Sequence, residues 1–119
     1  MTDSVTIYGI ANCDTIKKTK QWLTEHEITF KFHDYRKQGL NPALLSNWVN
    51  DLGWDLLVNR RGTTWRQLSD LVKTTIDKES AIQIMLDNPA IIKRPLLVKG
   101  DERHVGFSAA NYHQIFESK

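Results

Sequence analysis

The stretch VTIYGIANCDTIKK, residues 5–18, decides how the chain begins to fold. Residues 5–8 are β-branched or aromatic and end at Gly9, which predicts a first strand. Residues 12–15 are of types that start helices, and the positions after them recur on one helical stripe. That stripe consists of Ile16, Thr19 and Leu23. We therefore expect a strand, a short loop and a helix, with Cys13 at the first turn of the helix.

A second strand is predicted directly after this helix. Ile28, Phe30 and Phe32 alternate with the polar residues Thr29 and Lys31, which is the period of a strand with one buried face. Two parallel strands need a crossover connection, and the helix between them provides one. The first 35 residues therefore predict a βαβ unit.

The middle of the chain is predicted to be helical. Asn41-Pro42 is typical of a helix start, and Gly53 is well placed to end that helix. Residues 64–67 fit a capping box, which predicts a second helix with Val72 on its inner face. A third helix is expected to end at Asn88-Pro89.

The last part of the chain predicts a hairpin and a final helix. Residues 96–98 and 103–105 read as two strands joined by a turn, and Ser108 can cap the helix that follows. The order is therefore βαβ, then helices, then ββα. This order matches an α/β fold of the thioredoxin-like type, a mixed four-stranded sheet with a helical insertion at about 41–88. We expect one domain spanning residues 1–119.

Composition excludes several classes of protein. The 119 residues are 40% hydrophobic and 25% charged, with a net charge of +2, which gives no strong attraction to nucleic acid. No run reaches the ~18 apolar residues of a membrane helix, and from the first residues we expect no secretory signal. The four histidines show no metal-ligand spacing. We expect a cytoplasmic protein with no nucleic-acid, membrane or metal partner.

The single cysteine, Cys13, is the strongest candidate for chemistry. A helix N-terminus favours an anion, and a thiolate there has a lowered pKa. Lys17 and Lys18 add positive potential, whereas Asp14 opposes a second negative charge. The alternative is a buried structural cysteine. Because the sequence holds one cysteine, any disulfide that Cys13 forms must be with another molecule.

Two basic segments are candidates for binding. Arg94-Pro95 lies directly before the third strand, where an arginine can bind an oxyanion or a carboxylate through two hydrogen bonds. Arg60 and Arg61 lie in a polar loop between helices. The alternative for each arginine is an exposed side chain on a solvated surface.

Four motifs together resemble the arsenate-reductase-like family, the ArsC/Spx group, and most closely its YffB-type branch. These are YGIANCDTIKK (8–18), HDYRK (33–37), NRRGTTW (59–65) and IIKRP (91–95). The resemblance covers essentially the whole chain. It implies a thioredoxin-like fold with a helical insertion, a cis proline at Pro95, and a nucleophilic Cys13 that works with glutathione or glutaredoxin.

The resemblance also implies an anion-binding site, and this sequence departs from the family's site at one position. Arsenate reductases of this family bind their oxyanion with three arginines, of which one corresponds to Arg94 and another to Arg60 or Arg61. The third falls at or next to Phe107, which carries no guanidinium. Regulators of the Spx type in this family carry a Cys-x-x-Cys motif, but position 16 of this sequence is Ile16.

The sequence therefore predicts a glutathione-dependent monothiol reductase, a thiol-disulfide oxidoreductase without a bound cofactor. Cys13 and Arg94 would be catalytic, and glutathione or a small oxidised thiol would be the substrate. The residues predicted to bind substrate are Asn12, Arg60, Arg61 and Pro95. Two alternatives stay open: a Spx-like protein-binding regulator without redox turnover, and an arsenate reductase with an incomplete oxyanion site.

Overall fold

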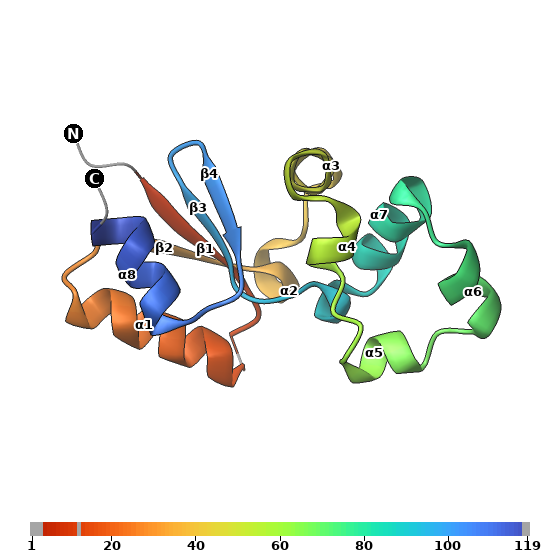
Figure 1. Cartoon of the computed structure of the whole chain (residues 1–119), viewed down its shortest axis with the longest axis horizontal. Coiled ribbons are helices and arrows are strands. Elements are labelled where there is room, and N and C mark those ends of the chain that lie inside the picture. The colour runs from red at the N-terminus through yellow and green to blue at the C-terminus, as the bar shows by residue number, and fades with distance from the viewer. Residues whose placement is uncertain (1–3, 12, 118–119) are drawn as a thin grey trace. The chain divides into compact units, whose positions relative to one another are not determined.

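The computed structural model describes residues 4–11 and 13–117 (Figure 1). The chain divides into two compact units. The first, here called the sheet unit, takes residues 1–34 and 94–119. The second, the helical unit, takes Tyr35–Lys93, and the insertion predicted at about 41–88 lies within it. The assignment of the whole chain to one domain stays a prediction.

The sheet unit is built on four strands in the order β2-β1-β3-β4. Their bounds are β1 Val5–Gly9, β2 Lys31–Asp34, β3 Leu96–Lys99 and β4 Glu102–Val105. Strand β1 runs parallel to β2 and antiparallel to β3, and β3 and β4 form the hairpin. The mixed four-stranded sheet predicted from the sequence is confirmed.

Two helices, α1 (Asp14–Glu25) and α8 (Ala109–Glu117), pack together in the sheet unit (Figure 1). Trp22 of α1 meets Tyr112 of α8 edge to face, with ring centroids 5.5 Å apart. The core of this unit consists of Val5, Ile7, Ile16, Trp22, Leu23, Leu97 and Tyr112. The backbone N–H of Asn111 donates to Ser108 Oγ at 3.1 Å, so the cap predicted for the last helix is confirmed.

Gly9 ends β1 at a point where the following helix approaches closely. A Cβ at this position would lie 2.5 Å from Cδ1 of Ile16, a fully buried side chain of α1. A side chain at this position would force the buried Ile16 side chain to shift, which glycine avoids. Gly9 thus allows the strand and the helix that carries Cys13 to pack directly.

Gly9→Ala should lower the free energy of unfolding by about 1–3 kcal/mol, because an added methyl group overpacks the contact with Ile16. Urea denaturation of the single variant measures this loss. Ile16→Val removes the Cδ1 atom that the new methyl meets, so Gly9→Ala should cost less in that background. An equal cost in both backgrounds would contradict the assigned contact.

The helical unit holds six short or medium helices and one 3-10 turn in the described residues. These are α2 Tyr35–Gln38, α3 Pro42–Leu52, α4 Trp54–Leu57, α5 Thr63–Arg66, α6 Asp70–Thr75, α7 Lys78–Asp87 and η1 Pro89–Ile91. Asn41 caps α3 by accepting the Ala43 N–H at 2.8 Å, and Gly53 ends it at a φ of 89°. Leu45, Trp48 and Met85 are fully buried.

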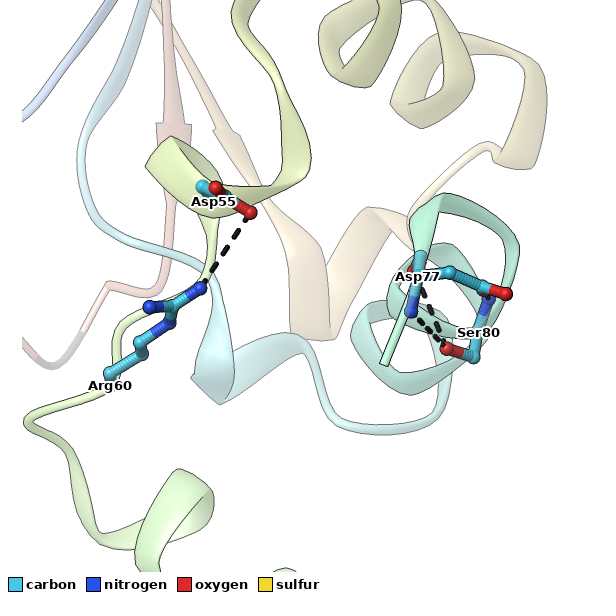
Figure 2. Close-up of polar contacts among 4 residues, drawn as sticks. All are labelled: Asp55, Arg60, Asp77 and Ser80. Atoms are coloured by element: carbon cyan, nitrogen blue, oxygen red, sulfur yellow. Dashed lines mark hydrogen bonds and ion pairs between the residues drawn. The ribbon is translucent and has the colours of Figure 1, made fainter. Parts of the chain in front are cut away.

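The helix predicted from the capping box at residues 64–67 through Val72 is wrong. The chain forms two separate helices here, because Ser69 caps a new one by accepting the Val72 N–H at 3.2 Å. A serine side chain competes with the continuing helix for backbone groups. The capping box in this region is instead the pair Asp77 and Ser80 at the start of α7 (Figure 2).

A short antiparallel bridge joins two distant segments of the helical unit. Val58 pairs with Ile92, and the Asn59 N–H donates to the Ile91 carbonyl at 2.8 Å. The Lys93 N–H donates to the Leu57 carbonyl at 2.7 Å. This bridge brings the loop that begins at Asn59 next to Lys93.

Candidate active site

Cys13 is the N-cap residue of α1, one position before the helical turn in which it was expected. Its extended backbone, with φ −139° and ψ 130°, directs its carbonyl to the Lys17 N–H, which donates at 3.0 Å. The side chain is half-buried and packs against the core of the sheet unit. The unpaired amides of the first helical turn therefore begin beside the sulfur.

The surroundings of Cys13 lower the pKa of its thiol. The largest single effect, burial, raises the pKa, because it disfavours the charged form. The backbone N–H groups of Ile16 and Thr15 and the hydrogen-bonding, positively charged side chain of Arg94 lower it. Together these opposing effects outweigh burial, so the thiolate is favoured relative to an ordinary cysteine.

Arg94 lies two residues before β3, and its side chain is half-buried. The Arg94–Pro95 peptide bond is cis, as the resemblance implied. Pro95 is buried, and its carbonyl accepts the Gly106 N–H at 2.9 Å. Pro95 therefore lies at the junction of β3 with the end of the hairpin.

The interaction between Arg94 and Cys13 goes beyond the sequence prediction. That prediction places Arg94 near the end of the sheet, as a group that binds an external anion. The interaction follows from the antiparallel register of β1 and β3, in which Tyr8 pairs with Leu96, and the sequence pattern carries no signal for this register. If this register is continued, the residues before Leu96, which include Arg94, lie beyond the end of β1. The loop that contains Cys13 begins at this point.

The other predicted site residues do not all belong to the sheet unit. Asn12 lies outside the described residues. Arg60 and Arg61 lie in the helical unit, after α4. Arg60 forms an ion pair with Asp55 at 3.6 Å, drawn in Figure 2.

Residues 4–11 and 13–117 provide neither a metal cluster nor a membrane helix. No group of three or more His, Cys, Asp or Glu side chains among them is arranged to hold a metal ion. None of their helices combines the length and the apolar character needed to cross a membrane.

Residues 8–115 match the model of the ArsC family. The chain belongs to the ArsC family. This match covers both units, from the first strand to the last helix. It confirms the resemblance drawn from the four sequence motifs.

Two solved structures are similar to this chain over nearly its whole length. The YFFB protein is 41% identical, with a TM-score of 0.87 over 92% of this chain and 96% of that one. An arsenate reductase (ArsC) related protein from Brucella melitensis is 43% identical, with a TM-score of 0.80 over 98% and 96%. The fold predicted for the YffB-type branch is confirmed.

Sequence relatives include an uncharacterized protein of Haemophilus influenzae, 44% identical over 94% of this chain and 98% of its own length. The global transcriptional regulator Spx 2 of Lactococcus lactis is 29% identical over 87% of this chain and 80% of its own length. The proteins similar to this chain therefore include one named for regulation as well as one named for its relation to arsenate reductase.

Arg94→Gln should raise the pKa of Cys13, because it removes a positive charge beside the sulfur. The midpoint of the pH profile of alkylation by iodoacetamide measures this pKa. Arg103→Gln makes the same chemical change elsewhere in the sheet unit and should leave the midpoint in place. An unchanged midpoint in Arg94→Gln would show that Arg94 does not act on the thiolate.

The lowered pKa also links the stability of the protein to pH. Thiolate formation favours the folded chain, and this contribution is fully present above the pKa of the unfolded cysteine. It is lost as the pH falls through the lower pKa of the folded state. As the pH increases from the folded to the unfolded pKa, the free energy of unfolding of the native protein should therefore rise relative to that of Cys13→Ser. Urea titrations at several pH values measure this difference. Parallel profiles for the two proteins would contradict the shift.

Proposed function

We propose that this protein is a glutathione-dependent monothiol reductase with Cys13 as its nucleophile. The observation that carries the proposal is the environment of the sulfur. Cys13 caps α1, faces the amides of Thr15 and Ile16, and interacts with Arg94, and these groups lower its pKa. A thiolate is the reactive form of cysteine, so this environment favours attack on an oxidised sulfur.

The proposed reaction has two thiol-disulfide exchanges. The Cys13 thiolate attacks the glutathione sulfur of a mixed disulfide, forms a Cys13–glutathione disulfide and releases the substrate as a thiolate. The thiolate of a second glutathione then attacks the glutathione sulfur of that disulfide, which releases Cys13 and forms oxidised glutathione. A glutaredoxin thiol can replace the second glutathione, in which case the product is a mixed disulfide of glutaredoxin and glutathione. The net reaction reduces one glutathione mixed disulfide and oxidises one free glutathione, because the oxidised glutathione that forms contains the glutathione removed from the substrate.

Arg94 has a defined part in this scheme. Its positive charge stabilises the Cys13 thiolate before attack and again when that sulfur is the leaving group. A lower pKa makes a better leaving thiolate, so the same charge favours resolution of the intermediate. The sequence holds one cysteine, which leaves the resolving thiol to an external molecule.

Phe107 supports disulfide reduction over arsenate reduction. The resemblance implies an oxyanion-binding arginine at or next to this position. Here the Phe107 ring instead packs edge to face against Tyr112, with centroids 4.8 Å apart. An aromatic side chain in a core contact supplies neither charge nor hydrogen-bond donors for an oxyanion.

A second candidate function is protein-binding regulation of the Spx type. The observation in its favour is the likeness to a global transcriptional regulator over 87% of this chain. In that case Cys13 would not act as a catalytic nucleophile. Catalytic activity with glutathione therefore separates the two candidates.

Cys13→Ser should abolish turnover of a glutathione mixed disulfide while the fold is retained, because serine cannot form the disulfide intermediate. The assay follows oxidised glutathione with glutathione reductase and NADPH, and far-UV circular dichroism checks the fold. Ser46→Ala, a change within α3 of the helical unit at a position that caps no helix, serves as the matched control. Turnover by Cys13→Ser, or none by the native protein, would contradict the proposed reductase.

A further inference from the structure

The loop after α4 borders an open hollow in the helical unit, with a volume of about 460 Å³. Its lining residues are Asp55, Val58, Asn59, Arg60, Arg61 and Lys93. Three of these side chains are cationic and one is acidic, so the lining carries a net positive charge. The volume falls within the range of small-molecule sites. The hollow therefore suits a small anion.

Arg60 is already engaged by neighbours within this unit. Its guanidinium forms the ion pair with Asp55 at 3.6 Å and lies 5.3 Å from the ring centroid of Trp54. It also lies 5.6 Å from the ring of Trp65. The cation–π contacts orient this guanidinium, and the exposed carboxylate partly offsets its charge. Arg60 thus forms part of the wall of the hollow.

Arg61 has a fixed backbone and an available side chain. Its N–H donates to Asn59 Oδ1 at 3.1 Å, and its carbonyl accepts a hydrogen bond from Nη2 of Arg66 at 2.8 Å. Within residues 4–11 and 13–117 the exposed guanidinium of Arg61 makes no hydrogen bond, ion pair or ring contact. Its fork of N–H donors is therefore free to bind a ligand.

Lys93 contributes a second cation from a different segment. The bridge between Val58 and Ile92 and the bond from the Lys93 N–H to Leu57 hold its backbone beside the loop. Its half-buried side chain lines the hollow, and its ammonium has no polar partner in the described part of the chain. Arg61 and Lys93 thus present two unneutralised cations to one cavity.

We propose that Arg61 and Lys93 bind a carboxylate of a small peptide, glutathione, in this hollow. Arg61 offers the planar fork that matches a carboxylate, and Lys93 adds a compact charge. Arg61 then binds the ligand, whereas Arg60 only lines the hollow. The sequence left open which of the two arginines binds. It rests on the proposed function for the choice of glutathione as the ligand.

Calorimetric titration of S-methylglutathione into the Cys13→Ser protein tests the site without thiol chemistry. Adding Arg61→Gln should raise the Kd about tenfold, the typical effect of a charge-assisted hydrogen bond. Adding Lys93→Gln should raise the Kd several-fold, a smaller effect, because a flexible ammonium attracts a carboxylate as a point charge and lacks the planar fork of arginine. Lys78→Gln removes the same charge from an exposed position on α7 and should leave the Kd unchanged.

Two results would overturn the assignment to Arg61: an unchanged Kd in Arg61→Gln, or a larger loss in a folded Arg60→Gln variant. Inorganic phosphate is the second probe. If phosphate binds in an Arg61-dependent manner and S-methylglutathione does not, the hollow is an oxyanion site and the carboxylate assignment is wrong.

The binding result is independent of turnover. If the native protein has no reductase activity but binds S-methylglutathione in an Arg61-dependent manner, the proposed function alone is rejected. Normal turnover with no Arg61-dependent binding would reject the subsite alone.

Discussion

The placement of one sulfur at the N-terminus of α1 is the constraint on which the account depends. Burial opposes the thiolate of Cys13, whereas the amides of Thr15 and Ile16 and the charge of Arg94 favour it. These groups come from two segments that are distant in sequence. The pKa of the thiol is therefore a property of the folded sheet unit and cannot belong to the local peptide alone.

Strand pairing in the sheet unit brings these segments together. The parallel pairing of β1 with β2 requires the α1 crossover, and the antiparallel pairing of β1 with β3 carries Arg94 to the cysteine loop. Gly9 permits the close approach of β1 and α1 by leaving room for Ile16. The packing that stabilises the fold thus also sets the position of the nucleophile.

Much of this fold can be predicted from local patterns. The alternation in residues 28–33, the cap at Asn41 and the hairpin after Pro95 each depend on neighbouring residues. The structure contains the cap and the hairpin, and the predicted second strand forms later than expected, at Lys31–Asp34. The break after α5 could not be predicted from the apolar spacing, because the Ser69 cap competes with an otherwise regular helical pattern.

The sequence predicts which residue types form the candidate site, but it predicts the contacts between their side chains less well. A lone cysteine after a first strand indicated a thiolate, and its position at a helix start is confirmed. The interaction of Arg94 with the sulfur depends on strand register, which the sequence pattern leaves undetermined. The different surroundings of Arg60 and Arg61 depend on Trp54, Trp65 and Asp55, and adjacent arginines in a loop carry no local signal of such contacts.

The most direct test of the thiolate is the rate of Cys13 alkylation as a function of pH in the folded protein and in the urea-unfolded chain. The unfolded chain should give a midpoint near the ~8.5 of a free thiol, and the folded protein a lower one. A folded midpoint equal to or above the unfolded one would contradict the stabilised thiolate at the start of α1.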